Sequence, residues 1–343
     1  MLRKSGFEAF ADLLSDCVST EGFRQFYEST GVCQEDFIQI LPQDFQGHLH
    51  AIDGSNAVIF SWAVANLNWI RAGYVTYHNK MWQRTVMTYD DAFFASAQEY
   101  AEQFGLYLKN IFGLKVLDLK ETELERLSSY FRELQEYIAL WYALRCAISG
   151  DLILYDGGFV DWESRLLKGA LEVIFKEAKE KHIGILGISK SSTLAWGPGF
   201  SRPFVQFAGL VGDHIAPKNP WYVCLDNKNV QPNPNEWEGK TYIVRFSGAS
   251  SWAYRVDAPF FVADHIDNTL GKLVDYACSA ECYGYPHALF RAHREIRITN
   301  QEKDTQKLKL LSLLGKRGFN EIQLRNLLLD YHDVIEFRSR GIV

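Results

Sequence analysis

Two segments that each lead into an Asp-Gly pair restrict the fold of this chain more than any other feature. Residues 47–53 are predicted to form a strand that ends at Asp53, and residues 151–156 a strand that ends at Asp156. Glycine follows each aspartate, and its conformational freedom lets the backbone turn and leaves the carboxylate open to a ligand. Adjacent strand ends in one sheet would bring the two carboxylates within a few ångströms of each other.

The segments around these pairs predict the rest of the sheet. β-Branched and aromatic residues indicate strands, and apolar residues every three or four positions indicate helices. The further elements are strands near 70–78, 81–89 and 182–189 and helices near 121–148 and 162–181. The order β-β-β-α-β-α-β predicts an α/β fold, in which an antiparallel meander is followed by a parallel β-α-β unit with a right-handed crossover.

The helix at 121–148 has recognisable ends. Thr122 and Glu125 resemble a capping box, and Gly150 is typical punctuation after a helix. Its apolar stripe runs through six residues, Leu124, Leu127, Phe131, Leu134, Ile138 and Trp141.

Three regions are predicted along the chain. Residues 1–45 form an amphipathic helical arm that either packs on the body or makes a dimer contact, 46–300 form the main α/β domain, and 301–343 form a basic helical segment. The main domain carries several short β-like pieces at 203–257, interrupted by a Pro/Asn-rich loop at 231–236, and becomes helical from Pro259 onward. The arm's apolar residues are Phe7, Phe10, Leu13, Leu14 and Cys17, and the basic residues of the last segment include Arg325, Arg338 and Arg340.

Composition excludes some classes of protein. The six cysteines contain no Cys-x-x-Cys pair, which disfavours a zinc site. No signal peptide or apolar run of membrane-spanning length is evident, so a cytoplasmic location without membrane contact is expected. The net charge of −6 does not indicate a nucleic-acid binder, but catalytic carboxylates add negative charge that metal ions offset locally.

The paired carboxylates indicate a metal site. Two carboxylates held close together repel and need a cation or a shared proton, and hard oxygen ligands suit Mg²⁺ or Mn²⁺. Either Asp-Gly pair alone would more simply be a turn, but their joint position in the strand order favours a site. A third carboxylate is expected from the 121–148 helix, where Glu133 and Glu136 both border the apolar stripe.

A second cluster of polar residues lies near the C-terminus, in Tyr283-Gly284-Tyr285-Pro286 and on to Arg294. Pro286 suits the first turn of a helix. On that helix His293 could bind a metal or carry a proton, and Arg291 could hold a phosphate. A basic, solvated helix face would explain the same residues.

Five short pieces, in order and spanning most of the chain, resemble the NurA nuclease family, which partners the HerA-type hexameric DNA translocase in DNA-end processing and repair. They are Ala51 to Ser55, Leu152 to Gly157, Gly187 to Lys190, Tyr254 to Asp257, and Gly284 to Pro286 with Arg291 to His293.

The resemblance implies a ribonuclease-H-like fold and a DNA nuclease. Asp53 and Asp156 match the family's metal-binding aspartates, and Tyr285 and His293 its C-terminal site residues. Glu136 is preferred to Glu133 because Arg132-x-x-x-Glu136 resembles the family's helix motif. Lys190 resembles a strand-end lysine that contacts a phosphate, and Gly158 departs from a common serine.

The implied chemistry is phosphodiester hydrolysis with two Mn²⁺ or Mg²⁺ ions, one activating a water and one stabilising the leaving oxygen. His293 would be a ligand or proton carrier, and Tyr285 would orient substrate or stack on a base. A homodimer that works with a HerA-type ATPase is expected.

Other functions have to be weighed. Gly184 to Ser191 nearly matches a phosphate-binding loop, but Ser189 replaces its second glycine and Gly184 falls inside a predicted strand, which argues against an ATPase. A catalytically silent subunit that guides DNA for a translocase remains an alternative, as does another ribonuclease-H-like nuclease acting on RNA–DNA hybrids or Holliday junctions.

Overall fold

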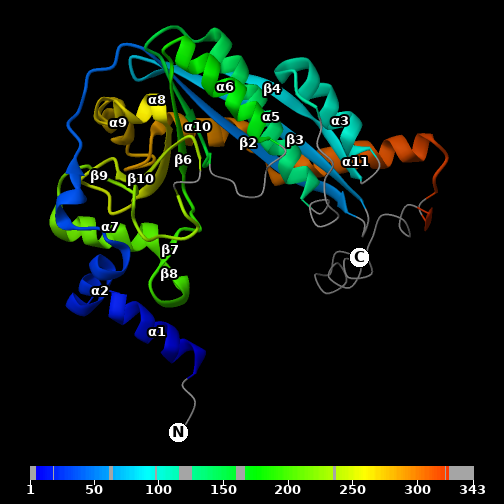
Figure 1. Cartoon of the computed structure of the whole chain (residues 1–343). Helices are drawn as coiled ribbons and strands as arrows, with labels where there is room; N and C mark the ends of the chain where they lie inside the picture. The colour runs from blue at the N-terminus through cyan, green and yellow to red at the C-terminus, as the bar shows by residue number, and fades with distance from the viewer. Residues whose placement is uncertain are drawn as a thin grey trace.

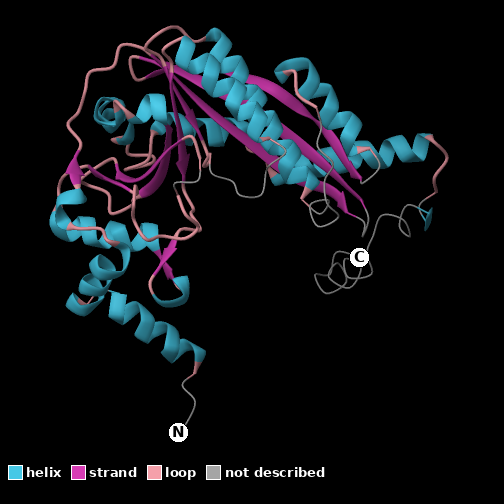
Figure 2. Ribbon diagram, in the orientation of Figure 1, coloured by secondary structure: helices cyan, strands magenta, loops and turns pink. Residues whose placement is uncertain are grey.

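A nine-stranded mixed sheet with helices on both faces forms the body of the computed structural model (Figure 1, Figure 2). The structure describes residues 5–17, 19–61, 65–96, 99–115, 126–159, 167–234, 237–320 and 322–323. The strands are β1 (Ile38–Gln39), β2 (His48–Ser61), β3 (Ala65–His78), β4 (Met81–Ser96), β5 (Leu152–Tyr155), β6 (Gly184–Ser189), β7 (Ala195–Trp196), β8 (Arg202–Pro203), β9 (Trp221–Cys224), β10 (Gly239–Arg245) and β11 (Tyr254–Pro259). Strands β7 and β8 pair with each other in a separate two-stranded sheet.

Helices cover the sheet and extend from it. They are α1 (Gly6–Cys17), α2 (Thr20–Thr30), α3 (Tyr100–Tyr107), α5 (Leu127–Cys146), α6 (Lys168–Glu180), α7 (Phe204–Ile215), α8 (Phe260–Ala263), α9 (Ile266–Val274), α10 (His287–Ile296) and α11 (Asn300–Lys316). Short 3₁₀ helices lie at Gln34–Asp36, Pro198–Phe200 and Asp275–Ala277, and one π-helical turn lies at Leu108–Phe112.

The strand order is β1-β9-β10-β11-β6-β5-β2-β3-β4. Strands β2, β3 and β4 pair antiparallel, whereas β2, β5 and β6 pair parallel, and β11 returns antiparallel to β6. The predicted meander followed by a parallel β-α-β unit is therefore confirmed, and the fold is α/β with a ribonuclease-H-like mixed sheet.

The β3–β4 hairpin shows how the local sequence builds the meander. Its two turn residues, Asn79 and Lys80, have φ of 49° and 62°, and His78 pairs with Met81 across the turn. Two consecutive left-handed residues make the tight turn whose twist matches that of the strands it joins.

Strand β2 separates two hydrophobic cores. Ile52 packs into the core under α5 and α6, whereas Leu49 and Ala51 pack into the core under α9 and α10. Because side chains alternate between the two faces of a strand, Asp53 lies on the α10 face and Gly54 on the α5 face. This alternation decides which helix supplies each neighbour of the aspartate.

The strand carrying Asp53 is longer than predicted. The sequence analysis predicted a strand that ends at Asp53, but β2 continues to Ser61 and pairs with β3 along almost its whole length. Asp53-Gly54 is therefore not a turn, and the glycine has another role that the site explains.

A second correction concerns residues 204–215, which were expected among β-like pieces but form helix α7. Phe204, Phe207, Ala208 and Val211 are buried at helical spacing, so one face packs on the sheet. The helices expected from Pro259 onward are confirmed in α8 to α11.

The N-terminal arm is helical only in part, because residues 38–39 form the edge strand β1. Helix α2 packs on the body through Phe26, whose ring contacts Trp196 and Phe207, while Phe7 of α1 is exposed. Of the described helices, none is both long and apolar enough to cross a membrane. The predicted cap at Thr122 and Glu125, residues 162–166 of the predicted 162–181 helix, and Arg325, Arg338 and Arg340 lie outside the described residues.

Candidate metal centre

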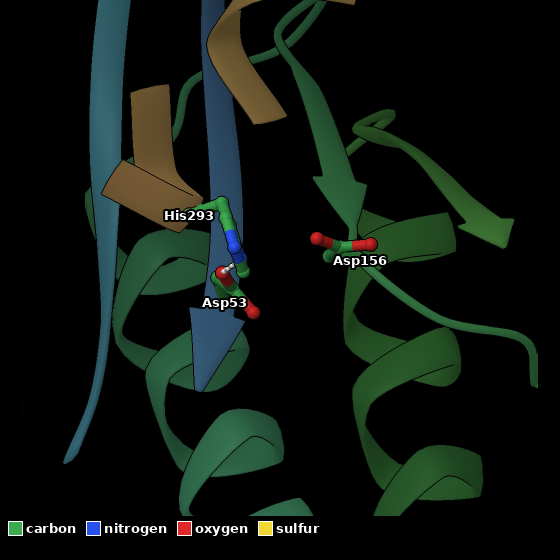
Figure 3. Close-up of side chains that lie close together, drawn as sticks. All are labelled: Asp53, Asp156 and His293. Carbon is green, nitrogen blue, oxygen red and sulfur yellow. Dashed lines mark hydrogen bonds and ion pairs between the residues drawn. The ribbon is translucent and has the colours of Figure 1, made fainter. Parts of the chain in front are cut away.

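Asp53, Asp156 and His293 converge from three separate elements (Figure 3). Each contributes one possible ligand atom, and these atoms all lie within 4.8 Å of one another. His293 Nδ1 lies 3.0 Å from Asp53 Oδ2. The sequence analysis proposed these three residues as metal ligands, and the structure brings them together.

The register of the parallel strands brings the aspartates together. Ile52 of β2 pairs with Tyr155 of β5, so the next residue on each strand is an aspartate. The backbone N–H of Asp156 donates to the carbonyl of Ile52 at 3.1 Å, which fixes the backbone where β5 ends. Neighbouring strands lie about 4.8 Å apart, and the two carboxylates therefore meet.

Asp156 is held by two further side chains. The Tyr285 hydroxyl donates to Oδ1 at 3.2 Å, and the Lys190 ammonium donates to Oδ2 at 2.5 Å. Lys190 Nζ also lies 5.1 Å from the centre of the Tyr285 ring. Burial and the charge of Asp53 raise the pKa of Asp156, which Lys190 and Tyr285 oppose.

Glu136 lies behind Asp53 on the other face of β2. It is fully buried, its Oε1 accepts from the Arg132 guanidinium, and its Oε2 accepts from the Tyr155 hydroxyl at 2.9 Å. Burial raises the pKa of Glu136 to about 7, and the negative charge of Asp53 adds to the shift while Arg132 opposes it. Among the described residues, the three-ligand group does not include Glu136.

Gly54 explains how Glu136 comes so close to the strand. A methyl group at residue 54 would overlap Glu136 Oε1 and Cγ, so only glycine leaves room for this carboxylate. Glu133, the other candidate, is also buried and accepts from the Tyr137 hydroxyl at 2.6 Å. It is thus Glu136 that lies against the residue next to Asp53.

A buried aspartate that sequence reasoning did not single out supports the segment after Asp156. Asp257 Oδ2 accepts from the backbone N–H of Phe159 at 2.9 Å, and Arg255 and Thr241 donate to the same carboxylate. A Cβ at Gly158 would lie 2.9 Å from Asp257 Oδ2, which explains why glycine stands there. The only sequence signal was its place in the Tyr254 to Asp257 motif.

Arg291 is not brought to the carboxylates. Its guanidinium pairs with Glu295 at 2.8 Å and lies 4.9 Å from the Trp82 ring centre. Trp82 pairs with Tyr77 of β3, and Tyr77 pairs with Leu49 of β2. Leu49 lies four residues from Asp53, which is about 13 Å along the strand. Lys190, in contrast, lies in the site.

The donor set fits a hard divalent cation. Two carboxylates and one imidazole, partly open to solvent at His293, are ligands that Mn²⁺ and Mg²⁺ accept, and the cation would relieve the repulsion between Asp53 and Asp156. Lys190 supplies part of that neutralisation in the structure itself.

The fold and this site agree with the chain's relatives. A family model described as the NurA domain matches residues 47–298, which include all three converging residues. The chain belongs to the NurA family. This family match supports a nuclease.

Solved structures resemble this NurA chain in fold. The crystal structure of the NurA nuclease from Sulfolobus solfataricus superposes with a TM-score of 0.52 at 16% identity, covering 94% of this chain and 99% of that one. Endonuclease V from Ciona intestinalis, solved in complex with a DNA, has a TM-score of 0.36 at 13% identity, covering 88% of this chain and 99% of that one. The catalytic domain of human endonuclease V has a TM-score of 0.37 at 11% identity, covering 87% of this chain and 98% of that one. No curated protein sequence matches the chain significantly.

Proposed function

We propose that this chain is a metal-dependent nuclease that hydrolyses phosphodiester bonds of DNA during DNA-end processing and repair. The observation that carries the proposal is the convergence of Asp53, Asp156 and His293 on one point at the end of β5. A carboxylate-rich centre of this kind beside a lysine is suited to a negatively charged phosphodiester.

Each residue of the site is given a role by its contacts. Asp53 and Asp156 would hold Mn²⁺ or Mg²⁺, and a bound cation supplies a reactive water and neutralises charge on the phosphate. His293 contacts Asp53 through Nδ1, so its Nε2 is placed to ligate or to move a proton. Lys190 would hold a phosphate oxygen, and Tyr285 would orient Asp156 and the substrate.

The second ion of the proposed pair would need Glu136 as a ligand. Both Glu136 oxygens accept hydrogen bonds, from Arg132 and Tyr155, so its carboxylate would have to exchange one of them to ligate. Ion counting by titration with Mn²⁺ tests this, with two ions expected for the wild-type protein and one for Glu136→Gln.

A cleavage assay on single- and double-stranded DNA, with Mn²⁺, Mg²⁺ or a chelator, tests the function. Asp53→Asn and Asp156→Asn should each lower the cleavage rate at least about 100-fold, because a bound metal ion stabilises the transition state by several kcal/mol. Asp275→Asn is the matched control, because Asp275 pairs with Lys80 at the surface and should leave cleavage unchanged. RNA–DNA hybrid and Holliday-junction substrates run alongside test the third candidate.

The second candidate is a catalytically silent subunit that guides DNA for a translocase. If wild type and Asp53→Asn are equally inert with and without a HerA-type ATPase, this candidate replaces the nuclease. The proposed partner is that ATPase, added as a hexamer in the same assay.

We also propose a homodimer. The edge strand β4 supports it, because Met81 and Trp82 are 68% and 46% exposed on a strand whose far side has no described neighbour in the sheet. Sedimentation should give twice the chain mass, and a monomer at micromolar concentration would contradict the proposal.

A further inference from the structure

The loop between β10 and β11, residues 246–253, reaches the same edge of the sheet as the metal centre. Arg255 at the start of β11 pairs with Ser189, the last residue of β6, and Lys190 follows directly. β11 lies two strands from β5, so the loop is about 10 Å to the side of Asp156. Trp252 lies in this loop and is 68% exposed.

Contacts of the loop backbone hold it in place. Gly248 packs on the carbonyl of Lys218, and Ser250 packs against Gly284, with no room for a side chain at either glycine. Gly209 of α7 faces the loop on a third side, 3.6 Å from Ala253 as measured from an added Cβ. A large apolar ring is therefore presented to solvent on an anchored support, which costs little ordering when a ligand binds.

The strand that follows the loop is connected to Asp156 through Tyr285. Tyr254, two residues after Trp252, contacts the Tyr285 ring with centroids 5.1 Å apart, and the Tyr285 hydroxyl donates to Asp156. Lys190 lies over the same Tyr285 ring. Two aromatic rings thus connect Asp156 to Tyr254, which lies two residues from Trp252 in the sequence.

We propose that Trp252 is a stacking platform for an unpaired base of the DNA strand, next to the phosphate held at Asp53 and Asp156. The inference rests on the proposed nuclease function and narrows its substrate to a strand that is single-stranded at the site. Aromatic faces stack on any base, so the platform is tolerant of sequence. A base within a duplex is covered by its neighbours and is not available to the ring.

Steady-state cleavage of single-stranded DNA separates stacking from catalysis. Trp252→Ala should raise KM about tenfold with kcat nearly unchanged, because stacking contributes to substrate and transition-state binding alike. Trp252→Phe should retain most of the affinity, whereas Trp252→Leu, which is apolar but has no ring, should behave like alanine. Phe260→Ala is the matched control, an aromatic residue 51% exposed just beyond the other end of β11.

A binding experiment makes the result independent of turnover. Asp53→Asn protein is titrated into a single strand carrying 2-aminopurine. Ring stacking should quench the fluorescence when Trp252 is intact and when Trp252→Phe is added to Asp53→Asn, but not when Trp252→Leu is added. Equal KM for Trp252→Ala and Phe260→Ala, or equal losses on blunt duplex and single strand, would overturn the platform. Absence of Asp53-dependent cleavage would instead overturn the proposed function, so the two failures are distinguishable.

Discussion

The α-carbon of Gly54 faces the carboxylate of Glu136 so closely that no side chain fits between them. The glycine was expected to let the chain turn after Asp53, but β2 continues through it as a regular strand. Its missing side chain instead lets a fully buried glutamate approach the back of the metal centre. Asp53 of β2 thus contacts His293 of α10, and the next residue, Gly54, leaves space for Glu136 of α5.

Gly54→Ala should therefore destabilise the protein by about 1–3 kcal/mol, as overpacking in a filled interior does, and lower cleavage as well. Urea unfolding measures the first effect. Gly315→Ala is the control, since an added methyl there meets nothing within 4 Å and alanine favours a helix. In Gly54→Ala/Glu136→Ala the clash is removed, so the two substitutions should be strongly non-additive. Additive losses would mean that Glu136 is not what residue 54 accommodates.

His293→Ala should weaken apparent Mn²⁺ affinity about 10–100-fold, because the imidazole contacts Asp53 and is placed among the possible ligands. Isothermal titration of the metal measures this. Arg294→Ala changes the neighbouring residue of α10, which pairs with Glu281 at 3.5 Å, and should leave the affinity unchanged. If both variants bind Mn²⁺ as wild type does, His293 is not a ligand.

The sequence predicted the parts of the site that depend on strand order. Asp53 and Asp156 could be expected together because each was predicted at a strand end and the β-β-β-α-β-α-β order resembles the ribonuclease-H-like one. The pairing of β2 with β5 and its register are seen only in the structure. The sequence could place His293 on a helix but could not place that helix beside the aspartates. Helix α10 begins more than a hundred residues after Asp156, and where it packs depends on tertiary contacts.

Other residues could not be predicted because their roles depend on contacts across the sheet. Asp257 lies in a strand far along the chain from Phe159, whose N–H it accepts, and a buried Asp in a strand has no local pattern. Arg291 lies two residues from His293, so its side chain leaves the helix on the opposite side and meets Trp82. Helix α7 was missed because β-branched and aromatic residues at 204–215 suit either structure until packing decides.

Lys190→Gln should bind Mn²⁺ more tightly but cleave more slowly. The ammonium lies 2.5 Å from Asp156 Oδ2 and competes with a cation for that oxygen. A partly exposed ion pair contributes at most about 1 kcal/mol, so the gain in metal affinity should be no more than about fivefold. The loss in kcat follows from removing the charge proposed to hold the phosphate. Arg202→Gln, which removes a cation stacked on Trp196 away from the aspartates, is the control. Tighter metal binding without slower cleavage would restrict Lys190 to a role at Asp156.

Asp151 should make stability depend on acid pH. Burial by itself would raise the pKa of Asp151, but the His50 imidazole 3.8 Å away and hydrogen bonds from the backbone N–H groups of Ile148 and His48 lower it to about 2, below its ordinary 3.8. A carboxyl whose pKa falls on folding stabilises the protein at pH above 3.8, and that contribution is lost as pH falls through about 2.

Comparison with Asp151→Asn isolates this contribution from other carboxyls. The variant should be less stable by about 2 kcal/mol at neutral pH, because hydrogen bonds to a charged acceptor are replaced by weaker ones. Chemical unfolding at intervals from about pH 5 down to about pH 2 measures the difference between the two proteins. It should stay constant until the pH approaches about 4 and then shrink steadily, since the wild-type carboxylate gains its proton more readily when unfolded. A difference that is unchanged at about pH 2 would show that the charge of Asp151 does not stabilise the turn before β5.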